Sequence, residues 1–142
     1  MSNKFNSEGY YSPTEHEALK RIERQEKVER RKAKYRPLVY ICSPFSGKVR
    51  KNKKKARKYC RFALEQHSIP FAPHLLFPQF MDDNSPEERQ LAMFMNMIML
   101  GHCEELWVFG ERISAGMKQE IRKAERKHMR IRYFTEDLEE KK

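Results

Sequence analysis

The sequence predicts an α/β fold, in which a parallel sheet of four to five strands has helices on both faces. Two short apolar runs without polar alternation, at residues 38–42 and 105–110, have the pattern of strands that are covered on both sides. Each run is followed by a turn of small residues and then by a segment of helical length. Strands that alternate with helices form a parallel sheet of the Rossmann-like (flavodoxin-like) kind.

The apolar residues are concentrated between positions 37 and 134, which indicates one compact domain with additions at both ends. We expect residues 1–35 to form a charged, mostly helical extension, residues 36–134 the domain, and residues 135–142 a charged tail that is frayed or weakly helical. Ser12-Pro13-Thr14-Glu15 has the residues of a helix start, and Arg36-Pro37 ends that helix. Its few apolar residues predict a helix that lies on the surface, packs on a partner or frays.

The first half of the domain begins with the strand at 38–42 and the turn SPFSG at 43–47. A helix over residues 49–66 follows, which buries Ala56, Tyr59, Cys60 and Ala63 and turns most of its lysines to solvent. Residues 68–72 give a second short strand. Residues 73–84 (PHLLFPQFMDDN) predict a long, proline-interrupted loop, whose aromatic residues form a wall.

The second half begins with Ser85-Pro86-Glu87-Glu88, which predicts the start of a helix that runs to residue 100. This helix is rich in methionine, which is typical of a core or a dimer interface rather than a cofactor site. Residues 105–110 give the third strand, ISAGMKQE at 113–120 leads into a helix that ends near residue 127, and residues 129–134 give the fourth strand.

Composition argues against several classes of protein. No apolar run approaches the roughly 18 to 20 residues that cross a bilayer, and the N-terminus lacks the apolar core of a signal peptide, so we expect a cytoplasmic protein with no membrane partner. Cys42, Cys60 and Cys103 lack the paired spacing of a zinc site, so we expect buried thiols and no metal. Neither GxGxxG nor GxxxxGK[ST] is present, and we expect no cofactor.

The net charge of +10 is unevenly distributed along the chain. Nine of the fourteen residues from 48 to 61 are Lys or Arg, and none is acidic. This run is the solvent face of an amphipathic helix, and it leaves open a nucleic-acid partner. It lacks the interleaved exposed aromatic residues that are typical of proteins that bind single strands.

Both turns of small residues, SPFSG and ISAG, follow predicted strands, and ligands of parallel sheets bind at the carboxyl ends of the strands. Free backbone N–H groups and the helix dipole favour an anion such as phosphate there. Glu120 lies about one and a half helical turns beyond Ser114. It is either a solvated helix charge or a carboxylate that faces the same cleft as Ser114 and Gly116. In the second case it would be repelled by a phosphate unless it took part in chemistry, such as attack on a sugar carbon.

Four collinear segments carry a resemblance to a known family: VYICSPFSG, APHLLFPQFMDD, CEELWVFG and ISAGMKQEI. From about residue 36 to residue 134 the chain resembles the nucleoside 2-deoxyribosyltransferase superfamily, and within it a bacterial and phage branch. The resemblance implies that Glu120 is the nucleophile that takes the 2-deoxyribosyl group. Where the transferases typically carry Asp, this chain has Ser114. There it resembles the related 2-deoxynucleoside 5′-monophosphate N-hydrolases, in which a Ser contacts the 5′-phosphate.

The same resemblance implies that SPFSGK at 43–48 forms the other half of the phosphate and base pocket, with Phe45 stacked on the nucleobase. His74 either lines the base pocket or is a hydrogen-bonded loop histidine. The expected partners are a nucleotide and a second copy of the chain, as a dimer. With Glu120 as the catalytic residue, the substrate-binding residues that we expect are Tyr40, Ser43, Phe45, Ser46, Gly47, Lys48, His74, Asn96, Ser114, Gly116 and Met117.

Asn96 departs from the family pattern, because the family enzymes usually place there an Asp that holds the sugar and assists the nucleophile. Asn can hydrogen-bond a hydroxyl group but cannot exchange a proton at neutral pH. Other acids that we consider are Asp82, Asp83, Glu104 and Glu105, although each is more typical of a loop or strand-edge charge. Three functions stay open. They are an N-glycosidase-like enzyme, hydrolase or transferase, that acts on 2-deoxynucleoside monophosphates; a catalytically inactive nucleotide or nucleotide-sugar sensor on the same fold; and a basic nucleic-acid-binding protein.

Overall fold

The computed structural model describes residues 13–142, and the chain divides into two units, Met1–Tyr35 and Arg36–Lys142. The described part of the first unit is helix α1 (Pro13–Lys34). The helix ends close to Arg36-Pro37, as predicted, because proline disfavours the helical conformation in the residue before it. The predicted cap Ser12 lies outside the described residues.

The second unit contains one sheet, in the order β2-β1-β3-β4-β5. The four predicted strands are parallel to their neighbours, and a fifth short strand pairs with β4 in the antiparallel sense. The predicted α/β fold with a flavodoxin-like sheet is therefore confirmed. The strands are β1 (Leu38–Cys42), β2 (Ile69–Phe71), β3 (Glu105–Phe109), β4 (Arg130–Phe134) and β5 (Glu140–Lys141).

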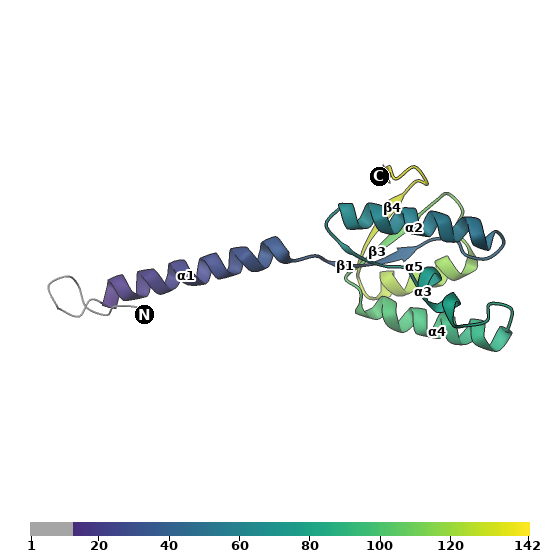
Figure 1. The fold of residues 1–142 in the computed structure, drawn as a ribbon, viewed down its shortest axis with the longest axis horizontal. Coiled ribbons are helices and arrows are strands. Elements are labelled where there is room, and N and C mark those ends of the chain that lie inside the picture. Colours follow the sequence, from purple (N-terminus) through teal and green to yellow (C-terminus); the bar gives the residue numbers. More distant parts are fainter. Residues whose placement is uncertain (1–12) are drawn as a thin grey trace. The chain divides into compact units, whose positions relative to one another are not determined.

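Helices cover both faces of this sheet, with α2 (Val49–Glu65) on one side and α4 (Pro86–His102) and α5 (Ala115–Arg126) on the other (Figure 1). A hydrophobic core lies on each face of the sheet. Because side chains alternate along a strand, β1 and β3 contribute side chains to both of these cores. Val39, Ile41, Trp107 and Phe109 pack with Tyr59 and Ala63 of α2, while Tyr40, Cys42, Leu106 and Val108 pack with Leu100 of α4 and with Met117 and Ala124 of α5. No helix among residues 13–142 is long and apolar enough to span a membrane.

Serine caps begin the two helices that lie on the same face of the sheet. Ser85 Oγ accepts a hydrogen bond of 3.3 Å from the backbone N–H of Glu88, and Pro86 occupies the first helical turn, as the sequence predicts. Ser114 Oγ accepts a hydrogen bond of 3.3 Å from the N–H of Met117 at the start of α5. On α4, Asn96 and Leu100 are buried, while Leu91, Phe94 and Ile98 are exposed, and self-association through this helix stays a prediction.

The prediction of a loop over residues 73–84 is wrong for the first half of this segment. Residues Pro73–Leu76 form helix α3 and Phe77–Gln79 form a 3-10 turn, η1. Both begin with a proline in the first turn, where its missing N–H costs nothing. Gln79 Nε2 donates a hydrogen bond of 2.7 Å to the Leu75 carbonyl oxygen and joins the two pieces.

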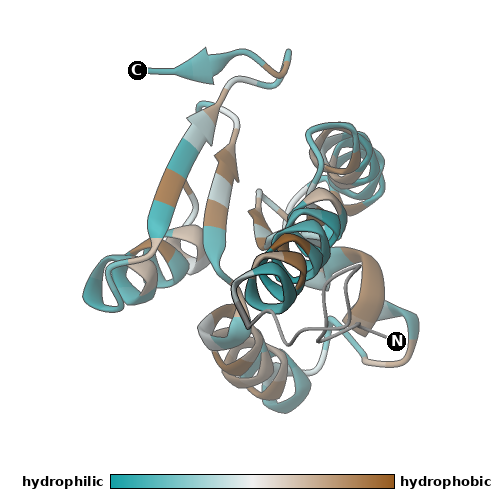
Figure 2. Ribbon diagram, turned by 90° about the vertical axis from the view of Figure 1, so that its left-hand side faces the viewer, coloured by the Kyte–Doolittle hydropathy of each residue, from teal (hydrophilic) through white to brown (hydrophobic). Residues whose placement is uncertain are grey.

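The predicted frayed or weakly helical tail is also wrong, because residues 135–142 fold back onto the sheet. Thr135 Oγ1 accepts hydrogen bonds of 3.2 Å from the N–H groups of Asp137 and Glu139, which makes the turn. Arg132 then holds Glu140 by two hydrogen bonds of 2.7 and 2.8 Å. The resulting strand β5 is hydrophilic, beside the C label in Figure 2, and charge pairing fixes the strand, while Leu138 of the preceding turn packs against the core.

Candidate functional site

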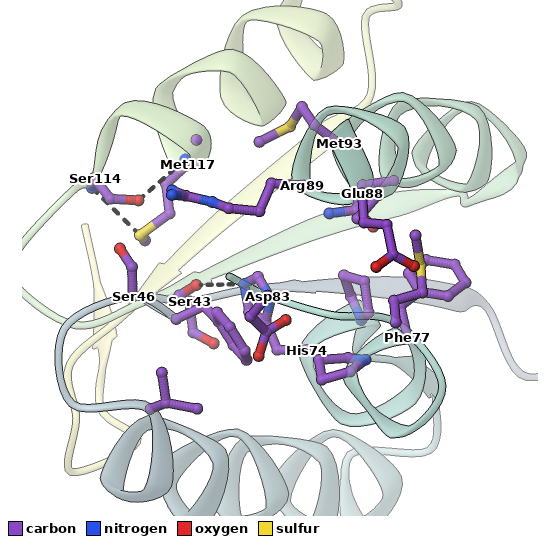
Figure 3. Close-up of a pocket in the computed structure, with 18 of the residues that line it drawn as sticks. Ser43, Ser46, His74, Phe77, Asp83, Glu88, Arg89, Met93, Ser114 and Met117 are labelled. Atoms are coloured by element: carbon purple, nitrogen blue, oxygen red, sulfur yellow. Dashed lines mark hydrogen bonds between the residues drawn. The ribbon is translucent and has the colours of Figure 1, made fainter. Parts of the chain in front are cut away.

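A pocket of about 540 Å³ lies at the carboxyl ends of β1 and β3. From β1 the chain moves to β2 on one side, and from β3 it moves to β4 on the other, so the two turns that follow diverge and leave a crevice. The volume is in the range of small-molecule sites. Both turns of small residues, as well as α3, η1, α4 and α5, line it (Figure 3).

The structure brings ten of the twelve expected catalytic and substrate-binding residues into the lining of this pocket, and it leaves Tyr40 and Lys48 out. Tyr40 is fully buried in the core behind the pocket, and Lys48 lies on the solvent side of α2 instead of in the pocket. Of the other acids, Asp82 and Asp83 line the pocket, whereas Glu105 accepts a hydrogen bond from Trp107 Nε1 at the far end of β3. The ten are Ser43, Phe45, Ser46, Gly47, His74, Asn96, Ser114, Gly116, Met117 and Glu120.

The turn after β1 is held in place by hydrogen bonds from two neighbouring elements. Gly47 has a φ of +95°, in the left-handed region that favours glycine, and lets the chain turn into α2. Asn52 Nδ2 donates a hydrogen bond of 2.9 Å to the Phe45 carbonyl oxygen. The His74 ring lies 4.7 Å from the Phe45 ring, centroid to centroid, so the two rings form one aromatic wall.

His74 is neutral in this environment. Burial lowers its pKa to about 4, and the hydrogen bond to the Ser43 carbonyl oxygen opposes this shift only in part. Its Nε2 lies 3.0 Å from that oxygen, which can only accept, so the neutral ring carries its proton on Nε2. The side chain is thus both a hydrogen-bonded loop histidine and a part of the pocket wall, the two roles that the sequence leaves open.

Glu120 is buried, with 2 % of its surface exposed, which excludes the solvated helix charge considered from the sequence. Glu120 lines the pocket, and its Oε2 is buried without a hydrogen-bond partner among the described residues. Burial raises the pKa of Glu120 to about 7, and the Tyr40 hydroxyl, which favours the charged form, lowers it in part. The carboxyl group is therefore balanced between its charged and neutral forms near neutral pH.

Tyr40 faces Glu120 from the core side. Burial raises the pKa of Tyr40 well above its ordinary value, and the negative charge of Glu120 raises it further, so the phenol keeps its proton. Its Oη has no partner in full hydrogen-bond geometry within residues 13–142, although it lies close enough to Glu120 to affect that carboxyl group. A small movement would complete a Tyr40–Glu120 hydrogen bond and favour the carboxylate.

Two more buried polar side chains of the pocket lack partners in the described part of the chain. Ser43 is 1 % exposed and Asn96 is 6 % exposed, and neither Ser43 Oγ nor Asn96 Oδ1 has a hydrogen-bond partner there. A buried polar atom without a partner is costly, by about 1 to 3 kcal/mol. Three such atoms in one pocket, those of Ser43, Asn96 and Glu120, indicate that a polar ligand or water completes them.

The start of α5 forms the opposite wall. The N–H groups of Ala115 and Gly116, in the first turn, have no acceptor within the helix, and both residues line the pocket. A Cβ on Gly116 would lie 3.0 Å from Met93 Cε of α4, so a small residue keeps the two helices close. The Ser114 hydroxyl accepts from Met117 and keeps its own proton free to donate.

The sequence reasoning missed several lining residues, of which Arg89 is the most important. Arg89 lies seven residues before Asn96, two turns earlier on the same face of α4, so helical periodicity from Asn96 was a signal for it. The same periodicity applies to Glu88, Ala92 and Met93, which lie on α4 at helical spacings from Arg89 and Asn96. The remaining lining residues come from other elements and turns, and no single residue pattern connects them. They are Val49, Pro73, Phe77, Pro78, Met81, Asn84 and Ala115.

No group of three or more His, Cys, Asp or Glu side chains among residues 13–142 has the arrangement of a metal site. Cys42 and Cys103 are buried and Cys60 is partly buried, and all three are free thiols. Two of the three pocket carboxylates of the 82–88 region form hydrogen bonds within their own loop, since Glu88 Oε2 accepts from the Asp82 N–H and Asp82 Oδ1 accepts from the Asn84 N–H. The third, Asp83, lies near His74 and raises the pKa of that ring slightly against the effect of burial.

A second, shallow surface lies outside the pocket, on the solvent side of α2. Lys55 of this helix is paired with Glu136 at 2.8 Å, and Lys58 Nζ donates to the Glu136 carbonyl oxygen. Arg61 of the same helix is paired with Glu65 at 3.0 Å. We call the six basic residues that line the shallow surface the α2 basic face. They are Lys48, Arg50, Lys51, Lys53, Lys54 and Arg57.

Comparison with known proteins agrees with this architecture. A search of the curated proteins gives no match. Among solved structures, the chain is similar to a 2-deoxyribosyltransferase from the psychrotolerant bacterium Bacillus psychrosaccharolyticus, with a TM-score of 0.53 and 17 % sequence identity over 69 % of this chain and 72 % of that chain. At this identity the likeness concerns the fold. A family profile described as a domain of unknown function, DUF7768, matches residues 37–134, and the chain belongs to this family.

Proposed function

We propose that the pocket binds a 2-deoxynucleoside monophosphate and that the protein is an N-glycosidase-like enzyme, which cleaves or transfers the bond between base and sugar. The single observation that carries the proposal is Glu120, a buried carboxyl group with an unpartnered oxygen at the pocket. Burial of a carboxyl group without a cation or hydrogen-bond donors is unfavourable for stability, and such groups are concentrated at functional sites.

In the proposed reaction, Glu120 attacks C1′ of the sugar, a bond forms between its carboxylate oxygen and C1′, and the bond from C1′ to the base nitrogen breaks. The base leaves with the electron pair of that bond and takes a proton from water. The transition state has oxocarbenium character, so a carboxylate at van der Waals distance stabilises its positive charge. Water or a second base then displaces Glu120 from C1′ and regenerates the free carboxylate.

Two other features of the pocket support this assignment. The wall formed by Phe45 and His74 offers aromatic surface on which a nucleobase can stack. Tyr40, which keeps its proton, lies behind Glu120 and favours its charged form, as a nucleophile requires. The likeness of the fold to a 2-deoxyribosyltransferase is consistent with sugar-transfer chemistry at this sheet edge.

Release of free base tests the proposal. Wild-type protein is incubated with each of the four common 2-deoxynucleoside 5′-monophosphates, and free base is quantified by chromatography beside Glu120→Gln and Glu120→Ala. We expect release by the wild type and a loss of at least about a thousandfold in both variants, because the covalent route is removed. No release by the wild type with any of the four, or equal release by Glu120→Ala, would contradict it.

A second candidate function is a nucleotide sensor without turnover, and Asn96 is the observation that favours it. Asn96 is buried and lines the same pocket as Glu120, yet its amide cannot carry the proton that the family Asp would supply. The sensor predicts a rise in melting temperature with nucleotide and no free base after long incubation. If no nucleotide or nucleotide sugar raises the melting temperature, the sensor function is excluded.

A further inference from the structure

The α2 basic face lies on the side of α2 that points away from the core. Ala56 and Tyr59 are among the buried residues of this helix. By the helical repeat Arg50, Lys54 and Arg57 lie on the other side, and all three are exposed. They fall within a rise of about 10 Å along the helix axis, which is close to one Debye length at moderate ionic strength. Their electrostatic fields therefore add over the whole face.

Other cations of α2 have acidic partners, whereas those of the α2 basic face do not. Lys55 is paired with Glu136 at 2.8 Å, and Arg61 is paired with Glu65, the one acid of this helix, at 3.0 Å. None of the six residues of the face forms an ion pair within residues 13–142. The six cations therefore add no ion pair to the stability of the described fold.

The position of these cations within the helix is unfavourable for stability. The N-terminus of a helix carries a partial positive charge, yet α2 has no acid in its first turn and no basic residue in its last turn. Helices α1 and α4 have the opposite arrangement, with acids first and basic side chains last. Arg50 and Lys54 are like charges four positions apart, as are Lys53 and Arg57, and such pairs destabilise a helix. A polyanion bound along the face would offset this repulsion and stabilise the helix.

The chemistry of the surface favours a nucleic-acid backbone over other polyanions. Among the described residues that line it, Val49 is the one apolar side chain. Membrane-bound helices insert an apolar side, but that of α2 is already buried in the core. Protein interfaces depend on an apolar or aromatic centre, which the described lining does not offer. Phosphodiester groups require only cations, and a backbone presents such groups in a regular row.

We infer that the α2 basic face binds the backbone of double-stranded nucleic acid, independently of the reaction proposed for the pocket. Single strands are held by stacking on aromatic rings, and the described lining of this surface contains none. Four of its six cations are lysines, which act as point charges on phosphates, so the binding is independent of sequence and weakens steeply with salt. A mononucleotide has a single phosphate group and spans little of the face, so the pocket remains its proposed site.

The experiment is fluorescence anisotropy of the full chain with labelled nucleic acids over a range of salt concentrations. The ligands are two DNA duplexes of unrelated sequence, an RNA duplex and a DNA single strand, all of the same length. Poly-glutamate and vesicles of phosphatidylcholine with phosphatidylserine serve as other polyanions, and their binding is measured by competition with the duplex. The test variant is the triple substitution Arg50→Gln, Lys54→Gln and Arg57→Gln.

The matched control is the triple substitution Lys118→Gln, Arg122→Gln and Arg126→Gln in α5. It also removes two arginines and one lysine from exposed positions, on the helix that covers the other face of the sheet (Figure 1). Both triple variants should melt as cooperatively as the wild type, because all six side chains are exposed. Glu120→Gln is a further variant, which removes the proposed pocket chemistry and leaves α2 unchanged.

For the wild type we expect duplex affinity to fall with salt with a log–log slope of about −4 to −5, since up to six phosphates each release about 0.9 of a counterion. The α2 triple variant should weaken duplex binding at least about tenfold at low salt and reduce the size of the slope by about 3. The α5 triple variant and Glu120→Gln should bind the duplex within about twofold of the wild type. The two DNA sequences should bind equally, and the ratio of DNA to RNA duplex identifies the source of the backbone.

The inference would be overturned by no duplex binding at low salt, or by tighter binding of the single strand than of the duplex. Equal weakening by the two triple variants would also overturn it, because net charge alone would then explain the binding. Competition by poly-glutamate or vesicles as strong as by duplex would assign the face to another polyanion. Duplex binding that depends on α2, without base release from any mononucleotide, would uphold the surface and reject the enzyme.

Discussion

The pocket and the α2 basic face both carry polar and charged side chains, but their surroundings differ. On the α2 basic face, cations such as Arg50, Lys54 and Arg57 are exposed, and water satisfies them. In the pocket, Ser43, Asn96 and Glu120 are buried, and each has an atom without a partner in the described residues. An exposed cation keeps its hydrogen bonds to water and carries no desolvation cost, whereas a buried polar atom without a partner destabilises the fold.

This difference shows why net charge is a poor guide to the site of this protein. The charge of +10 is dominated by residues on helix surfaces, while the pocket combines four carboxyl groups with a single arginine among its described lining residues. Polar groups that the fold keeps buried at a cost indicate function more specifically than charges that solvent accommodates. The predictions that follow test whether chemistry belongs to the pocket alone.

The largest expected effect is that of pH on base release. The pKa of Glu120 is raised to about 7, and the nucleophile must be charged, so the rate should rise about 100-fold between pH 5 and pH 8 and then level off. His74 stays neutral over this window, because its pKa is lowered to about 4. The substrate phosphate titrates near pH 6 and could also change the rate. Rates are therefore measured at saturating monophosphate and at saturating nucleoside, which has no phosphate, and a pH dependence common to both belongs to Glu120. A rate that is flat or falls with pH would contradict the role of Glu120.

The next effect concerns Asn96. Asn96→Asp should increase base release by about tenfold or more, because it supplies a carboxyl group that can exchange a proton beside the sugar. The added carboxylate should also raise the pKa of Glu120, so the pH profile should move to higher pH. Asn96→Ser, which keeps a polar group without an acid, is the matched control. If Asn96→Asp and Asn96→Ser have the same rate, an acid at this position is not what limits turnover.

Removal of the buried carboxyl group should stabilise the protein at high pH. The pKa of Glu120 is higher in the folded protein than its ordinary value of 4.5, so the free energy of unfolding falls as pH rises from about 4.5 to 7 and stays low above 7. Glu120→Gln should therefore be more stable than wild type by roughly 1 to 3 kcal/mol at pH 8 and about equal to it at pH 4.5. Urea unfolding at the two pH values measures this difference. The same pH dependence in both proteins would show that Glu120 is not strained by burial.

The smallest effect is expected on the α2 basic face. The triple substitution Arg50→Gln, Lys54→Gln and Arg57→Gln should change nucleotide affinity less than twofold and the free energy of unfolding by less than about 1 kcal/mol, because these side chains are exposed and do not line the pocket. Retention on DNA at low salt, measured in parallel, tests the nucleic-acid alternative. A loss of nucleotide affinity in the triple variant would mean that the two surfaces act together.

Sequence patterns predicted the elements that local residue preferences determine by themselves. The apolar runs of β1 and β3 and the Ser85-Pro86 cap belong to this class. The tail was mispredicted because its strand depends on the Arg132–Glu140 pair, a contact between residues eight positions apart that no propensity encodes. For the site, the two turns after strands pointed to the pocket, but burial of Glu120 and the reach of Arg89 depend on how α4 packs beside α5. Lys48 precedes α2, on the other face of the sheet, and is exposed on the solvent side of that helix.

The most direct test of the account is a structure of Glu120→Gln with a 2-deoxynucleoside 5′-monophosphate bound. The account predicts that C1′ lies within about 3.5 Å of the side chain at position 120, the near-attack distance for the proposed bond. It also predicts that the base lies against Phe45 and His74 and that the phosphate lies at the start of α5, beside Ser114. A nucleotide bound on the α2 basic face, or one in the pocket with C1′ far from position 120, would contradict it.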